Sequence, residues 1–260
     1  MKNISLSILS TLQIVSLFFC RKIIGPKGLI QLSWVCFFFS CMSLVWMPSA
    51  LSATEDEKPL QIAQQLADHL SSLDSLSFTF TQRTMGQMSG RPRQASGQAY
   101  FAKTDEGAKV RWNYQTPDSQ VILSDGTTLI MYFSNLNQMI VAPADTLQQD
   151  ITYSFFTGQS DLHHDFIVKE GPEPEETSEM NDYASILLVP RETRSQIKDI
   201  RLWILDTTQI KRIEIRDTFD TVTLLNLSNI KENSLTASGK LIDEDFFQFT
   251  PPEGTEIIHQ

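Results

Sequence analysis

The chain lacks cysteine after residue 53: Cys20, Cys36 and Cys41 all lie before that point. Residues 54–260 therefore contain neither disulfides, nor a catalytic thiol, nor a cysteine-based metal site. A segment of this length buries an adequate hydrophobic core without such cross-links. We expect residues 54–260 to fold as one domain held by packing alone.

The first 53 residues lack Asp and Glu entirely. They contain a basic cluster (Arg21, Lys22, Lys27), an apolar run over residues 29–47 and the small-residue stretch "PSALSA". This order is typical of a secretory signal sequence. We predict that residues 1–53 are a targeting segment removed after Ser52 or Ala53.

Two alternatives for this segment stay open. Its apolar runs are about long enough to remain as two membrane helices. Cys20 or Cys41 would accept a lipid in a lipoprotein signal, but bulky Phe19 precedes the first and apolar residues follow the second. Cleavage is the reading that the pattern favours.

Basic residues are scarce in the remainder. Four of the 21 Lys and Arg residues lie in the first 53 positions, which leaves 17 basic against 31 acidic residues, a net charge of −14. This charge argues against binding nucleic acid or anionic lipid headgroups. It suits a soluble protein of the periplasm.

Catalytic motifs are also absent. The sequence contains no G-x-S-x-G, no phosphate-binding loop and no H-E-x-x-H. His163 and His164 have no third ligand at recognisable spacing, and the acidic stretches "EDE" and "PEPEE" look like solvated charge. We expect no metal, no cofactor and no enzymatic activity, although a hydrolase with scattered carboxylates leaves little local trace.

Strand patterns dominate what is present. Apolar residues at helical spacing follow Pro59, which predicts a helix that starts there. Short alternating segments then predict about ten antiparallel strands, interrupted by one or two short helices within residues 144–162. The pattern indicates a mostly β (α+β) fold with one large curved sheet or barrel.

The segment "QVILSDGTTLIMYF" (residues 120–133) is apolar on both faces. Asp125-Gly126 predicts a hairpin turn, and such a hairpin must be covered on each side. "IRLWILD" (residues 200–206) shows the same doubled pattern. Either the core is thick, or one face of a concave sheet holds an apolar ligand.

The segments "FTFTQ", "RWNYQTPDSQVILSDGTTLIMYFSNLNQ" and "FTPPEG" closely resemble the outer-membrane lipoprotein carrier protein (LolA) family, over nearly all of residues 60–258. The resemblance implies an unclosed, strongly curved antiparallel barrel of about ten or eleven strands, with a helical lid over its apolar concave side. Proteins of this kind carry triacylated lipoproteins across the periplasm. They accept cargo from an inner-membrane ABC-type transporter and deliver it to an outer-membrane lipoprotein receptor, without chemistry of their own.

The resemblance also assigns residues by position. The predicted wall of the acyl-chain cavity consists of Phe78, Phe80, Val110, Trp112, Tyr114, Leu129, Met131, Phe133 and Trp203. The predicted lid consists of Leu66, Leu70, Ile151, Phe155 and Phe156. Family members commonly have an Arg-Pro just before the strand that holds the Trp, and this Arg holds the lid shut. The corresponding segment of this chain, "AKTDEGAKVRW", has no Arg-Pro, and Lys103 or Arg111 is the candidate substitute.

Carriage of lipoproteins by a monomer is thus the first hypothesis. The second keeps the fold but makes the protein a carrier or sensor of another lipid or amphiphile. Comparing the uptake of a lipoprotein with and without its acyl chains distinguishes these two hypotheses.

Overall fold

A computed structural model describes residues 57–86, 91–145, 151–157, 162–172, 183–192, 196–237 and 240–260. The predicted targeting segment, residues 1–53, lies outside this part. The first elements are α1 (Glu57–Ser72), β1 (Ser75–Met85), β2 (Arg93–Thr104), β3 (Gly107–Thr116), β4 (Gln120–Ser124), β5 (Thr128–Phe133) and β6 (Gln138–Pro143). Then follow α3 (Ile151–Phe156), α4 (Leu162–Asp165), β7 (Phe166–Glu170), β8 (Tyr183–Pro190), β9 (Ile197–Leu205), β10 (Gln209–Asp217), β11 (Val222–Glu232), β12 (Thr236–Ala237), β13 (Lys240–Leu241), η2 (Glu244–Phe247) and β14 (Glu256–His259).

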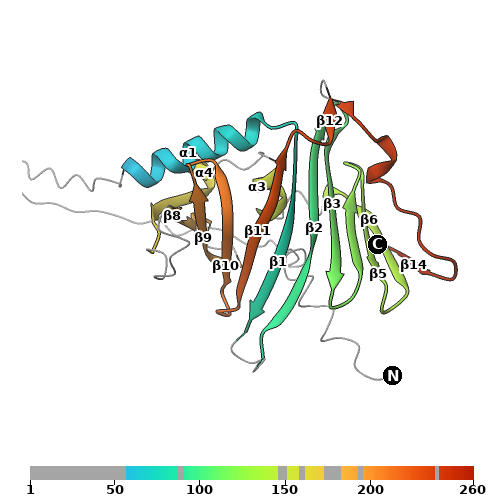
Figure 1. Ribbon diagram of the computed structural model, residues 1–260. Coiled ribbons are helices and arrows are strands. Elements are labelled where there is room, and N and C mark those ends of the chain that lie inside the picture. Colours follow the sequence, from blue (N-terminus) through green and yellow to red (C-terminus); the bar gives the residue numbers. More distant parts are fainter. Residues whose placement is uncertain are drawn as a thin grey trace, which may run out of the picture.

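Twelve strands form a single curved sheet in the order β14-β6-β5-β4-β3-β2-β1-β11-β10-β9-β8-β7 (Figure 1). Strands β14 and β7 are its two edges and do not pair, so the barrel is unclosed, as expected. The sheet has one or two more strands than predicted, and β12 and β13 form a separate small hairpin. One pairing differs from the antiparallel expectation, because β14 runs parallel to β6.

The helices lie on one side of the sheet. Helix α1 packs against β7, β8 and α4, while α3 lies further along the same side, behind β11 in the view of Figure 1. Helix α1 begins at Glu57, two residues before the predicted start at Pro59. Within the described segments, none of the helices has the length and hydropathy needed to cross a membrane.

Side chains alternate between two faces of the sheet. We call the face against which the helices pack the inner face; it carries Phe78 on β1 and Leu202 on β9, both in the main hydrophobic cluster. The cluster joins this face to the apolar side of α1.

The composition of the inner face changes along the sheet. From β8 to β11, the aliphatic half, its buried side chains are Ile186, Leu188, Ile200, Leu202, Ile204, Ile210, Ile213, Leu225 and Leu227. From β1 to β5, the aromatic half, the rings of Phe78, Phe80, Phe101, Trp112, Tyr114 and Phe133 lie among aliphatic side chains. The core is therefore one layer with two chemically different regions.

Candidate functional site

Five rings form a continuous surface on the inner face of β1–β3. We call Phe78, Phe80, Phe101, Trp112 and Tyr114 the aromatic wall. Phe80 lies 4.9 Å from Trp112 and 5.0 Å from Tyr114 between ring centroids, and Phe78 lies 5.9 Å from both Phe101 and Trp112. Most of these contacts are edge-to-face, the geometry that aromatic pairs favour.

A glycine allows two rings of the wall to approach each other closely. Gly97 on β2 lies between Phe80 and Tyr114 in the strand register. A Cβ atom at this position would lie 2.0 Å from the carbonyl oxygen of Asn113 and 3.0 Å from the Phe80 ring. The missing side chain lets the two rings meet across β2.

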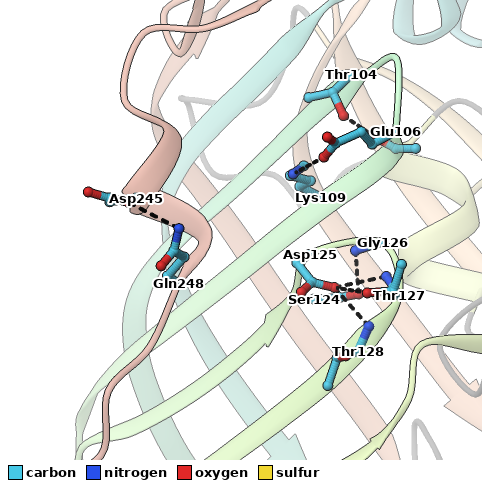
Figure 2. A network of polar contacts seen from close by, with 11 residues as sticks. Thr104, Glu106, Lys109, Ser124, Asp125, Gly126, Thr127, Thr128, Asp245 and Gln248 are labelled. Atoms are coloured by element: carbon cyan, nitrogen blue, oxygen red, sulfur yellow. Dashed lines mark hydrogen bonds and ion pairs between the residues drawn. The ribbon is translucent and has the colours of Figure 1, made fainter.

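The hairpin of β4 and β5 extends the inner face, as predicted. Leu129, Met131 and Phe133 are buried in the main cluster, together with Val110 on β3. The turn is fixed by Asp125, whose Oδ1 accepts hydrogen bonds from the backbone N–H groups of Thr127 and Thr128 and from the Thr127 hydroxyl, each at 2.8 Å (Figure 2). Burial alone would raise the pKa of Asp125, but these hydrogen bonds and nearby Lys109 hold that pKa below its ordinary value.

The outer face of the same hairpin is covered by the protein itself. Val121, Leu123, Tyr132 and Met139 form a second buried cluster, and Phe249 packs against it. The rings of Tyr132 and Phe249 are 5.1 Å apart. The segment that follows η2 therefore covers the outer apolar face, and the inner face is covered by the main hydrophobic cluster.

Helix α3 closes the aromatic half. Phe155 and Phe156 are buried, and the Phe156 ring lies 5.1 Å from Phe78 and 5.0 Å from Phe101. Tyr153 donates a long hydrogen bond (3.4 Å) to the carbonyl of Ala108, and burial raises its pKa. The predicted lid residue Ile151 begins this helix, but its side chain lies outside the described part.

Helix α1 covers the other part of the inner face. Its lid residues Leu66 and Leu70 are buried in the main cluster, beside β7, β8 and α4. Thus the predicted lid residues divide between two regions: α3 lies over the aromatic half, and α1 lies over the β7–β8 end of the sheet.

Lys103 on β2 holds the end of α1. Its Nζ donates to the carbonyls of Leu70 (2.9 Å) and Ser71 (2.7 Å), where a cation also complements the helix dipole. Burial lowers the pKa of Lys103, and neighbouring Asp74 partly opposes that shift. His69 adds a second tie through its 3.0 Å contact with Glu232 on β11.

Arg111, the other candidate substitute, has a different partner. Its guanidinium donates to the carbonyls of Phe246 and Gln248 and lies 5.2 Å from the centroid of the Phe246 ring. Arg111 therefore anchors the C-terminal segment on the outer face. Of the two candidates, only Lys103 contacts a predicted lid helix in these bonds.

A shallow pocket of about 10 Å³, with room for about one water molecule, opens between the ends of α1 and α3. Its lining includes Asp74, Phe101, Lys103 and Phe156. Drug-sized ligand pockets are usually about 300–1,000 Å³, so this space is too small for several acyl chains. In this structure the Phe156 ring packs directly on Phe78 and Phe101.

Trp203 differs from the other predicted wall residues. It alternates with Leu202 and Ile204, which face inward, and pairs with Arg212 and Ser185 on the outer face. The Arg212 guanidinium lies 5.7 Å from its ring. Both parities of "IRLWILD" are apolar, so the pattern alone did not show which set faces inward, and we leave Trp203 out of the site.

Phe101 is the wall residue that sequence reasoning missed. It lies on β2, where it pairs in register with Leu76 on β1 and with Val110 on β3. The alternation of Gly97, Ala99 and Phe101 in "GQAYFA" was the available signal. His163 and His164, by contrast, lie in α4 rather than in a strand, and the described residues contain no group of three or more side chains able to hold a metal.

The comparisons with known proteins agree with this geometry. The family model "Outer membrane lipoprotein carrier protein LolA" matches residues 71–250. The chain belongs to this family.

Individual relatives match at lower identity. The outer-membrane lipoprotein carrier protein of Nitrosomonas europaea is 30% identical over 166 residues, 64% of this chain and 73% of that protein. The protein of the same name from Cupriavidus necator is 27% identical over 197 residues, 75% and 87% of the two chains. A solved LolA superfamily structure from N. europaea covers 66% of this chain and 92% of its own, with 15% identity and a TM-score of 0.34, a superposition too loose to add to the argument.

Proposed function

We propose that this member of the LolA family is a periplasmic carrier that binds the acyl chains of triacylated lipoproteins. The observation that carries the proposal is the aromatic wall covered by α3, in which the Phe156 ring occupies the apolar surface. Displacing this short helix would expose Phe78, Phe101 and Trp112 together. The proposed site comprises the wall, the inner face of β4–β5 and the lid helices.

The energetics suit a carrier. Burial of each methylene contributes about 0.8 kcal/mol, so several acyl chains in an open cavity would bind almost irreversibly. In the closed form the wall is already in contact with the Phe156 ring. Loss of these contacts offsets part of the binding free energy and keeps cargo transferable.

The rest of the pathway belongs to the same proposal. Residues 1–53 direct export and are removed, and residues 54–260 act as one domain in the periplasm. Cargo arrives from an inner-membrane ABC-type transporter and leaves to an outer-membrane lipoprotein receptor. The protein catalyses no reaction and needs no cofactor.

Cargo with and without acyl chains tests the proposal. The purified protein is incubated with inner-membrane vesicles bearing a triacylated lipoprotein, and release into the supernatant is measured. The binding of the same lipoprotein without acyl chains is compared. We expect selective uptake of the acylated form; equal behaviour towards both forms would remove the proposal.

A pair of tryptophan variants localises the site. Trp112→Glu places a carboxylate in the aromatic wall and is expected to reduce uptake at least tenfold, because bound acyl chains would bury that charge without a partner. Trp203→Glu is the matched control, since that side chain lies on the outer face beside Arg212. Circular dichroism confirms that both variants are folded before uptake is compared.

A further inference from the structure

The inner face becomes more open and more polar along its strands. On β1 the inward side chains run from buried Phe80 to half-buried Gln82 and Thr84. On β3 they run from buried Val110 to half-buried Tyr114. Strands β4, β10 and β11 show the same gradient toward the same end. This end, opposite the start of β1 and lowest in Figure 1, is therefore the accessible end of the inner face.

Five uncharged polar side chains line the accessible end. We call them the polar row: Gln82, Thr84, Tyr114, Gln120 and Thr223. The Tyr114 hydroxyl donates to Gln82 Oε1 at 3.2 Å, and Gln82 Nε2 donates to the Thr84 hydroxyl at 3.3 Å. The hydroxyls of Thr84 and Thr223 are 3.4 Å apart. These distances are longer than is usual for hydrogen bonds, so exchanging them for bonds to a ligand would cost little.

Gln120 on β4 gives an independent indication of a ligand. It pairs in register with Tyr114 on β3 and with Phe133 on β5, which places it on the inner face beside the aromatic wall. Its Oε1 is buried and accepts no hydrogen bond from the described residues. A buried carbonyl oxygen without a donor is costly. An N–H group of a bound ligand would remove that cost.

The chemistry of the polar row favours an uncharged ligand group. None of its five side chains carries a charge. Arg93 on β2 pairs in register with Thr84, but it is exposed and already has an interaction partner. A phosphate or a free carboxylate would therefore lose its hydration in the row without gaining a cation. Ester carbonyls and amide N–H groups match the Nε2 donors and Oε1 acceptors that glutamine offers.

We propose that the polar row binds the ester and amide groups that join the acyl chains to the lipid-modified N-terminal cysteine of the cargo. The chains then extend along the aromatic wall toward Phe78 and Phe156. This inference rests on the proposed function and deepens it, because it assigns the linkage that is recognised and the direction in which the cargo lies. A site built to form hydrogen bonds rejects an analogue that lacks the matching groups.

Two synthetic triacyl lipopeptides that differ only in their glyceryl linkages test the inference. One carries ester-linked chains, and the other carries chains of the same length through ether bonds, which lack the carbonyl oxygens. Binding to the purified protein is measured by displacement of a fluorescent fatty-chain probe. We expect the wild type to bind the ester form at least about fivefold more tightly than the ether form.

Glutamine variants localise this preference. Gln82→Met combined with Gln120→Met keeps the side-chain length but removes the amides, and should bring the two affinities within about twofold of each other. Binding of the ether form should be retained, which also shows that the variant is folded. Each single variant should shift the ratio in the same direction, which keeps the test valid if the double variant is unstable. Gln98→Met is the matched control, because Gln98 lies on the outer face of β2 between inward Gly97 and Ala99.

Three results would contradict these expectations. Equal binding of the ester and ether forms by the wild type would overturn the inference. A preference that survives in the glutamine variants would place ester recognition elsewhere and would also overturn it. Failure of the wild type to bind either lipopeptide would refute the proposed function itself, and with it the inference.

Discussion

The two halves of the inner face are both buried, but by different kinds of side chain. In the aliphatic half, branched side chains such as Ile186, Leu202 and Ile204 are almost completely buried. In the aromatic half, large rings meet edge to face and are covered by the six-residue helix α3. Branched side chains interlock into one arrangement, whereas flat rings offer a smooth surface on which different apolar groups can lie.

The two helices that cover these halves also differ in how they are attached to the sheet. Helix α1 has 16 residues and is tied at its end by Lys103 and by His69. Helix α3 meets the wall chiefly through its rings, with Tyr153 adding a long hydrogen bond. We infer that α1 is the fixed part of the lid and α3 the part that cargo displaces.

The largest expected effect is a loss of stability from a substitution in α1, the fixed part of the lid. Leu66→Ala removes a fully buried side chain from α1 and should lower the free energy of unfolding by about 3–5 kcal/mol, as measured by urea denaturation. The affinity of the folded protein for an acyl-chain probe should stay unchanged. A large change in that affinity, with little loss of stability, would reverse the roles of the two helices.

The next variant changes α3, the part of the lid that cargo displaces. Phe156→Ala should cost less stability, about 1–3 kcal/mol, because a short helix can settle into the space left. It should also tighten binding of the acyl-chain probe by about fivefold to thirtyfold, since the ligand no longer has to displace a ring. Phe156→Leu serves as the control with intermediate volume. Weaker probe binding by Phe156→Ala would mean that the ring contacts the ligand instead of competing with it.

In both regions the strands and turns were largely predictable from the sequence, and the contacts between distant segments were not. The alternation around Phe78 and Phe80 and the Asp125-Gly126 turn fixed strands and faces, because local periodicity and turn chemistry determine them. Trp203 could not be placed, since the run from Leu202 to Leu205 puts apolar residues on both faces of β9. Neither the covering of Tyr132 by Phe249 nor the parallel pairing of β14 with β6 has a local signal, because each joins segments more than 100 residues apart.

The role of Lys103 was predictable only in part. The sequence narrowed the substitute for the missing Arg-Pro to two residues, but only the three-dimensional position shows that Lys103 reaches α1 while Arg111 anchors the C-terminal segment. A lysine makes its hydrogen bonds as a point charge without a fixed fork. This gives the end of α1 a strong but geometrically tolerant tie.

Removal of this tie gives the third prediction. Lys103→Met keeps the apolar stem but loses both hydrogen bonds, and should lower stability by about 1–3 kcal/mol. Hydrogen exchange at the last turn of α1 should accelerate, while exchange in α3 should not. Lys103→Arg, which retains the charge, is the control. Faster exchange in α3 alone would place the latch on the other helix.

The smallest expected effect concerns His69 and Glu232, whose side chains are partly exposed. Exposed pairs of this kind contribute about 0–1 kcal/mol, so Glu232→Gln should change the unfolding free energy by less than 1 kcal/mol. Combined with Lys103→Met, however, it should further speed exchange at the end of α1, because the two ties hold the same turn. If the double variant exchanges no faster than Lys103→Met alone, His69 does not help to fix α1, and Lys103 alone distinguishes the fixed helix from the displaceable one.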